Sequence, residues 1–116
     1  MSYVPEFVAL YEINPFIILA LDNESIRVAV KDYLEGGKKK DAIIKKYGKI
    51  EDWNTSEVTD MSYLFGMAEH FNENISEWDT SKVTDMSKMF CVAKTFNQDI
   101  SGWNTSKVTN MHAMFS

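Results

Sequence analysis

Apolar residues recur with a helical period in the first half of the chain. Residues 22–35 are predicted to form a helix because their apolar side chains fall on one helical face, made of Ile26, Ala29, Val30, Tyr33 and Leu34. Gly36 and Gly37 follow this segment and are expected to end the helix. A second, shorter helix is predicted over 41–47, with a glycine just beyond its end. Residues 22–48 are therefore predicted to be helical.

The second half of the chain is a repeat with a period of 25 residues. Its three tryptophans, Trp53, Trp78 and Trp103, are spaced by 25, and Ile, Thr, Ser, Val, Met and Phe positions follow the same spacing. Residues 76–90 and 101–115 share ten identities in fifteen positions. This period lies within the range of leucine-rich repeats. The predicted fold class is therefore α/β, a short leucine-rich-repeat-like solenoid of period 25 with a helical N-terminal cap.

Each repeat unit is expected to contain one short helix and one short strand. A helix or 3₁₀ turn is predicted to begin at Thr84 or Asp85, because apolar residues follow at helical spacing, and a strand is predicted within 96–103. Apolar columns of successive units are expected to stack as a core. The predicted core is Ile50, Trp53, Val58, Met61, Phe65, Phe71, Ile75, Trp78, Val83, Met86, Phe90, Phe96, Ile100, Trp103, Val108, Met111 and Phe115.

The chain divides into a cap at 1–49 and a repeat region at 50–116, with two full units and one partial unit. The cap comprises an apolar lead, 1–21, and the two helices within 22–48. The lead is either core or a docking segment for another subunit, and its apolar residues include Val4, Phe7, Val8, Leu10, Tyr11 and Ile13. The third unit stops at its last Phe-Ser pair, so a partner, another copy or a larger assembly is expected to cover the uncapped C-terminal end.

Charge and targeting signals exclude several classes of function. The formal net charge of −5 divides into +1 over residues 1–49 and −6 over 50–116, which disfavours nucleic acid as a partner. The one basic tract reads as a solvated surface and comprises Lys38, Lys39, Lys40, Lys45, Lys46 and Lys49. The longest apolar run, 16–21, is too short to span a membrane, and no positive signal region precedes it. We therefore expect a protein inside the cell or within an assembled particle.

Catalytic chemistry is not indicated, and no cofactor is expected. The single Cys91 excludes a disulfide framework, and His70 and His112 have no partner at metal-ligand spacing. Repeated side-chain oxygens make calcium the one metal worth considering, with Asp52, Asp60, Asp79, Asp85 and Asn110 as candidate ligands. A polar column beside the tryptophans is expected to hydrogen bond the backbone at each corner, and it consists of Asn54, Asp79 and Asn104.

The repeat resembles a known family. The unit 96–111, Phe-Asn-Gln-Asp-Ile-Ser-Gly-Trp-Asn-Thr-Ser-Lys-Val-Thr-Asn-Met, followed by Met114 and Phe115, is similar to the bacterial surface protein repeat of about 26 residues. That repeat belongs to the BspA-like leucine-rich-repeat surface proteins and a related domain of unknown function. The resemblance covers 50–116 and implies a leucine-rich-repeat-like fold with a binding or adhesive role. It implies no catalytic residues.

We therefore predict a non-catalytic protein–protein interaction module, whose partner is another protein or a copy of itself. The candidate binding face consists of two exposed columns in which side chains vary from unit to unit, Glu57, Lys82 and Lys107 in one and Tyr63, Lys88 and Ala113 in the other. The alternatives are an architectural subunit of a large assembly, such as a viral particle, and a calcium-stabilised adhesin-like repeat.

Overall fold

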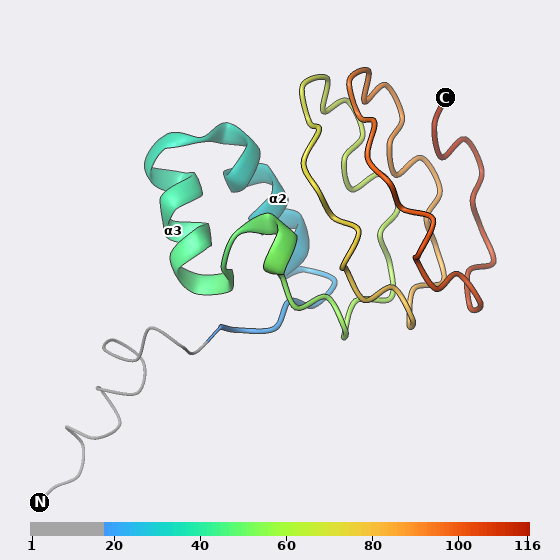
Figure 1. The fold of residues 1–116 in the computed structure, drawn as a ribbon, viewed down its shortest axis with the longest axis horizontal. Coiled ribbons are helices and arrows are strands. Elements are labelled where there is room, and N and C mark those ends of the chain that lie inside the picture. The colour runs from blue at the N-terminus through green and yellow to red at the C-terminus, as the bar shows by residue number, and fades with distance from the viewer. Residues whose placement is uncertain (1–17) are drawn as a thin grey trace, which may run out of the picture.

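A helical segment packs against one end of a stack of turn-rich coils (Figure 1). The computed structural model describes residues 18–116. Its regular elements are α2 (Ser25–Glu35), α3 (Gly37–Tyr47) and the 3₁₀ turn η1 (Ile50–Asp52), which leads into the first coil. The coils follow one another along the stack in chain order, each unit lying beside the next (Figure 1).

The two helices form a hairpin around a glycine. Gly36 takes φ 81°, a left-handed value that a residue with a side chain adopts at a cost, and it lets the chain reverse between α2 and α3. α2 lies within the predicted 22–35, whereas α3 begins at Gly37, four residues before the predicted 41. The extra turn consists largely of exposed lysines, which favour helix without contributing to an apolar stripe.

The predicted α/β repeat fold is wrong, and with it the leucine-rich-repeat-like solenoid. Residues 18–116 contain two α-helices, η1 and isolated parallel bridges, but no strand and no sheet. Tight turns take their place, as the N–H groups of Leu64 and Gly66 donate to the carbonyls of Met61 and Tyr63. Tyr63 has a left-handed backbone conformation, with φ 59°, and therefore cannot be part of an extended strand. The helix expected from Thr84 or Asp85 and the strand expected within 96–103 are therefore both absent.

Backbone hydrogen bonds join each coil to the next, and nearly all of them have the same polarity. The Tyr63 N–H donates to the Ser87 carbonyl at 2.9 Å, and the Lys88 N–H donates to the His112 carbonyl at the same distance. Neighbouring positions repeat this pattern, with donors at Met61, Phe65, Met67, Met86, Phe90 and Val92. Each coil thus presents most of its bonding N–H groups toward the following coil. The exception is the column of Thr59, Thr84 and Thr109, in which the N–H of Thr84 or Thr109 donates to the carbonyl of the preceding coil at 2.8 Å.

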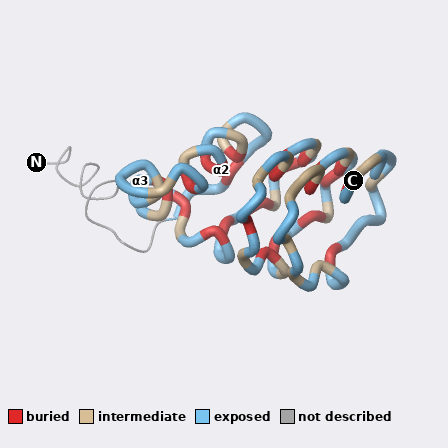
Figure 2. Tube along the Cα trace, turned by 90° about the horizontal axis from the view of Figure 1, so that it is seen from above, coloured by how far each residue is buried: buried red, intermediate tan, exposed pale blue. Residues whose placement is uncertain are grey.

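The core is built of side-chain columns that run along the stack. Figure 2 shows that buried positions recur from coil to coil along the chain. The rings of Phe65 and Phe90 stack with their centroids 5.8 Å apart, and those of Trp53 and Trp78 stack at the same separation. The Trp78 indole also donates to the Ile50 carbonyl at 2.7 Å, inside the core. The tryptophans therefore contribute both burial and a hydrogen bond between units.

Burial of the predicted core residues changes along the stack. The members of that set from Ile50 to Phe90, together with Trp103, are buried. Phe96, Ile100 and Val108 are half-buried, and Met111 and Phe115 are 46% and 62% exposed. Further buried side chains, absent from the predicted set, are Leu64, Met89, Met114, Thr55 and Thr80. The apolar layers thus become progressively more open toward the last coil.

Side chains of the helical segment make hydrogen bonds to the first coil that backbone groups make between later coils. Arg27 donates to the carbonyl oxygens of Asp60, at 3.3 Å, and Ser62, at 2.8 Å. In the next unit the equivalent carbonyls, Asp85 and Ser87, accept backbone N–H groups from the coil before. The guanidinium therefore replaces two backbone donors.

Asn23 supplies the matching acceptor. Its Oδ1 accepts the Thr59 N–H at 2.8 Å, while one unit later the Thr84 N–H donates to the Thr59 carbonyl at the same distance. The segment before α2 adds a donor, because the Leu21 N–H donates to the Asn54 carbonyl at 3.0 Å. The cap thus satisfies the polar groups of the first coil as well as covering its apolar layer.

The predicted apolar lead falls mostly outside the described residues. Within its described part, Leu21 is buried and Ala20 forms a parallel bridge with Asn54, while Ile18 and Leu19 are exposed. The predicted role of the remainder as core or docking segment stays a prediction. In the part of the chain that the structure describes, neither helix is long and apolar enough to cross a membrane.

Candidate functional site

The column of Tyr63, Lys88 and Ala113 has one backbone conformation and three different side chains. All three residues are left-handed, with φ of 59°, 56° and 54°. Tyr63 is 47% exposed, Lys88 is exposed and Ala113 is half-buried. The hydrogen bonds between coils hold these positions side by side. The repeat therefore presents chemically different groups on a constant framework.

The Tyr63 ring rests on Gly66. A Cβ built on Gly66 would come within 2.5 Å of the Cδ1 and Cε1 atoms of Tyr63, closer than any real contact. The positions equivalent to Gly66 are Cys91 and Ser116, and their partners in the Tyr63 column carry no ring. Glycine thus occurs where the aromatic ring needs the space, and the ring lies against the backbone of Gly66.

The second predicted column, Glu57, Lys82 and Lys107, is exposed and charged. The Lys82 ammonium lies 3.3 Å from the Glu57 carboxylate, with half or more of both side chains exposed. A pair this exposed contributes little to stability, because water screens it and ordering two long side chains costs entropy. The column is available to solvent along the stack.

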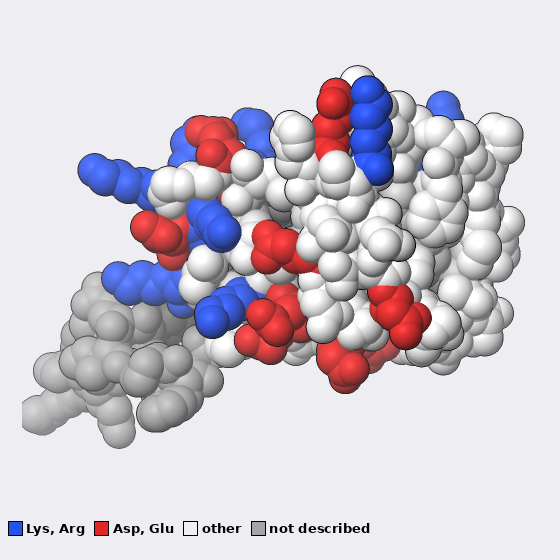
Figure 3. All heavy atoms as spheres, turned by 45° about the horizontal axis from the view of Figure 1, so that its top comes forward, with Lys and Arg blue, Asp and Glu red and all other residues white. Residues whose placement is uncertain are grey.

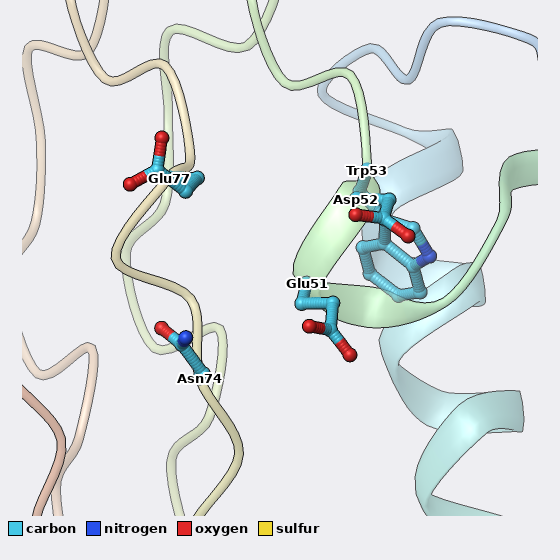
Figure 4. A pocket seen from close by; sticks show the side chains of 5 residues that line it. All are labelled: Glu51, Asp52, Trp53, Asn74 and Glu77. Carbon is cyan, nitrogen blue, oxygen red and sulfur yellow. The ribbon is translucent and has the colours of Figure 1, made fainter.

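Two shallow depressions were not predicted from the sequence. The first, of about 370 Å³, lies between η1 and the next coil. Figure 4 shows Glu51 and Asp52 on one side of it and Asn74 and Glu77 on the other. These residues lie about 25 positions apart, so the repeat period was the one signal in the sequence that could have brought them together.

The second depression, of about 340 Å³, lies where the helix hairpin meets the first coil. Lys40 lies over the Tyr33 ring at 4.7 Å, and the Tyr33 hydroxyl donates to the Glu73 carboxylate at 3.3 Å. Burial, followed by the nearby Glu73 charge, raises the pKa of Tyr33. The exposed His70 also lines this depression. The arrangement is a contact between cap and coil and offers no nucleophile with a base.

Four of the five candidate metal ligands, all except Asp52, accept hydrogen bonds in side-chain turns. Asp85 Oδ1 accepts the Ser87 N–H at 2.9 Å, and Asn110 Oδ1 accepts the His112 N–H at 3.0 Å. Asp60 accepts the Ser62 N–H and lies 3.3 Å from the Arg27 guanidinium. Among residues 18–116, no group of three or more His, Cys, Asp and Glu side chains is placed to hold a metal ion.

The remaining residues singled out from the sequence are dispersed. Cys91 is half-buried, and its backbone joins turns within and between coils. His112 is exposed on the last coil. The predicted basic tract lies on and just after α3, where Figure 3 shows Lys and Arg gathered over the helical segment, while Asp and Glu predominate on the coils in the same view.

The polar column at the corners forms side-chain turns, as the sequence predicts. Asp79 Oδ1 accepts the Ser81 N–H at 2.9 Å and the Ser81 hydroxyl at 2.6 Å. Asn54 makes the same two bonds to Ser56, at 3.1 and 2.7 Å. The hydroxyl of Ser81, followed by its N–H, holds the pKa of Asp79 below its ordinary value of 3.8.

The corner at Asp79 should be sensitive to acid. A carboxylate whose pKa is lowered by folding adds stability above its unfolded pKa, and that stability is lost as the pH falls through the folded pKa. Asp79→Asn keeps the turn, as Asn54 shows, and removes the titrating group. We expect the variant to be within about 0.5 kcal/mol of the wild type at neutral pH. Below about pH 4 it should lose less free energy of unfolding than the wild type does.

Urea unfolding at several pH values measures this difference. Asp41→Asn is the matched control, since Asp41 is an exposed acid on α3 for which no such turn is seen. Equal acid sensitivity of the wild type and Asp79→Asn would show that the turn at Asp79 does not favour the ionised carboxylate.

The comparison with protein families covers most of the described fold. Residues 38–116, from the first turn of α3 through the last coil, match the family described as "Mycoplasma protein of unknown function, DUF285". The chain belongs to the DUF285 family. No curated protein matches the chain, and no solved structure matches it. The DUF285 match includes both predicted binding columns and η1, whereas α2 with Asn23 and Arg27 lies before it.

Proposed function

We propose that this DUF285 protein is a non-catalytic interaction module that binds another protein through the Tyr63 column. The observation that carries the proposal is the exposed Tyr63 ring, which lies against Gly66. Tyrosine is among the residues that contribute most to protein–protein binding. A ring whose position is set before binding loses little conformational entropy when a partner covers it.

The energetic cost of this position supports the same function. A left-handed conformation costs a residue other than glycine about 1 kcal/mol or more. Burial returns little of that cost at Tyr63, because nearly half of the residue is exposed. The equivalent position 113 is occupied by alanine, so the fold does not require a large side chain there. The tyrosine is therefore better explained by what it offers to a partner than by stability.

The neighbouring units extend the surface. Lys88 follows Tyr63 in the column, and the Tyr63 N–H bonds to the carbonyl just before Lys88. An aromatic ring next to an ammonium group suits a partner that carries an apolar side chain beside a carboxylate. The Glu57 column adds charges that tune association rate more than affinity.

Affinity capture with variants tests the proposal. The wild-type chain, Tyr63→Ala and the control Val28→Ala are immobilised, and extracts of the source organism are passed over each. Val28 is 58% exposed on α2, outside the proposed surface. We expect the wild type and Val28→Ala to retain the same protein and Tyr63→Ala to bind it at least tenfold more weakly, as expected for loss of a main contact.

Two results would contradict the proposal: equal retention of that protein by all three chains, or loss of it on Val28→Ala alone. Gly66→Ala provides a second variant. Its added Cβ displaces the Tyr63 ring without removing it, so the retained protein should dissociate faster from this variant than from the wild type.

We also propose that the family relationship extends to the BspA-like surface repeat proteins. The motif shared with that repeat lies in 50–116, within the residues that match DUF285. A binding role fits both groups. The second function predicted from the sequence, an architectural subunit of a larger particle, stays a prediction.

A further inference from the structure

The exposed side of α3 is lined by lysines. The buried residues of this helix, Ile43 and Tyr47, fall on one side of it. Lys38 and Lys45 are seven positions apart and fall on the opposite side, where both are exposed. Two more exposed lysines lie at and just beyond the end of the helix. We call the whole set the lysine face, and it consists of Lys38, Lys45, Lys46 and Lys49.

The fold leaves the charge of the lysine face largely unbalanced. The other two lysines of the basic tract are engaged, because Lys39 lies 3.1 Å from the Glu35 carboxylate and Lys40 lies over the Tyr33 ring. Within residues 18–116, no salt bridge involves a member of the lysine face. Asp41 is the one acid within α3. The face therefore carries a surplus of positive charge that is available to a partner.

The first turn of α3 shows that this charge does not serve the helix. Lys38 lies in that turn, which contains no acidic residue. The N-terminal end of a helix carries a partial positive charge, so a cation there disfavours the helix. The Lys38 side chain is also exposed and adds little burial. Its charge is therefore better explained by what it attracts than by the stability of α3.

Positive and negative charges are separated along the molecule. Figures 1 and 2 show α2 between α3 and the coils, and Arg27 of α2 contacts the first coil. Residues 37–49 contain six lysines and one aspartate, a net charge of +5, whereas residues 50–116 carry −6. A negatively charged surface therefore attracts the molecule by its α3 side and repels the coils.

Apolar side chains lie beside the lysine face. The Leu19 N–H donates to the Lys46 carbonyl at 3.2 Å, which holds residues 18–19 against the last turn of α3. The Ile18 Cδ1 atom lies 3.5 Å from the position that a Cβ on Gly48 would take. Ile18 and Leu19 are 48% and 41% exposed. Aliphatic groups next to lysines suit the boundary between lipid headgroups and acyl chains.

We propose that the lysine face, together with Ile18 and Leu19, binds the surface of an anionic lipid bilayer. Clustered lysines on a helix are attracted to anionic headgroups, and adjacent apolar side chains add contact with the acyl region. Nucleic acid is a poorer match, because base recognition relies on arginine and on stacked aromatic rings, which the face lacks. An acidic protein would favour arginine, whose planar group pairs with a carboxylate.

Sedimentation with lipid vesicles tests this inference on the full chain. Vesicles of phosphatidylcholine and phosphatidylserine in equal amounts are compared with vesicles of phosphatidylcholine alone. The wild type should sediment with the first and not with the second, and added salt should release it. Lys45→Glu should bind at least about tenfold more weakly, because each lysine near the membrane adds attraction. Lys94→Glu makes the same charge change at an exposed lysine of a coil and should bind as the wild type does.

Two further variants separate binding from folding. Lys38→Glu places an acid where the helix dipole favours one, so urea unfolding should show a protein at least as stable as the wild type. It should nevertheless bind the anionic vesicles about tenfold more weakly. Leu19→Ser should weaken binding even at high salt, because salt does not screen the apolar contact that it removes.

Three results would overturn the inference: no sedimentation of the wild type with the anionic vesicles, equal binding to both vesicle types, or equal losses for Lys45→Glu and Lys94→Glu. Binding to duplex DNA that depends on Lys38 and Lys45, without binding to vesicles, would assign the face to nucleic acid instead. Tyr63→Ala leaves the lysine face intact and should bind vesicles as the wild type does. The inference is therefore tested independently of the proposed function.

Discussion

Replacing Phe90 with Ala should lower the free energy of unfolding by about 3–5 kcal/mol. The Phe90 ring is 2% exposed and stacks on Phe65, Phe96 and Phe115. The centroid of Phe96 lies only 4.1 Å away, within the same coil. Removing the ring therefore leaves a cavity between three others, and the coils cannot close it without breaking the hydrogen bonds between them. Urea unfolding measures the loss.

Phe115→Ala is the matched control. It removes the same side chain from the same column, but this ring is 62% exposed and has one stacked neighbour. We expect a loss of about 1 kcal/mol or less, since the area returned to water is small. Similar losses for Phe90→Ala and Phe115→Ala would show that the aromatic column is not the core of the coils.

Arg27→Met should cost about 2 kcal/mol, because hydrogen bonds from a charged donor contribute about 1.5–3 kcal/mol. The variant keeps an apolar stem of similar length and removes the guanidinium from the carbonyls of Asp60 and Ser62. The Asp60 carboxylate, 3.3 Å away, also loses its cation. Because the side chain is 39% exposed, water replaces part of what is lost.

Lys31→Met serves as the control for Arg27→Met. Lys31 is an exposed cation on the same helix, so this change alters the net charge equally. We expect it to shift the free energy of unfolding by no more than about 0.5 kcal/mol. Equal effects of the two substitutions would show that Arg27 acts through general charge and not by satisfying the carbonyls of the first coil.

The period of 25 predicts which residues share a column, because that conclusion needs only the spacing of like side chains. It does not predict what lies between the columns. Val and Thr at 83 and 84 favour a strand, and the methionine and phenylalanine positions after them favour a helix. Neither forms, because hydrogen bonds between coils stabilise tight turns that local propensity does not indicate.

The left-handed positions explain why the turns were missed. Such residues are usually Gly or Asn, which mark a turn in the sequence. Here they are Tyr63, Met67, Lys88, Val92 and Ala113, none of which carries that signal. The helices were easier to predict, since Gly36 and Gly48 mark their ends in the ordinary way.

The sequence predicts only part of the candidate surfaces. The exposed columns follow from the period. Glycine occurs at position 66, whereas Cys91 and Ser116 occupy the same column, and this difference was the signal in the sequence for the Tyr63 ring that lies over Gly66. The sequence does not predict the hydrogen bonds of Arg27, because they depend on where α2 lies over the first coil. The direction of the hydrogen bonds between coils was not predicted either, because side-chain patterns do not reveal it.

Amide hydrogen exchange of the wild-type chain tests the central claim, that most of the backbone hydrogen bonds between coils run from N–H groups of one coil to carbonyl groups of the following coil. The account predicts strong protection of the N–H groups of Tyr63, Phe65, Lys88 and Phe90, each bonded to the following coil, and fast exchange of Ala113 and Phe115, their equivalents in the last coil. Equal protection in all three units, or fast exchange at Tyr63 and Lys88, would contradict it.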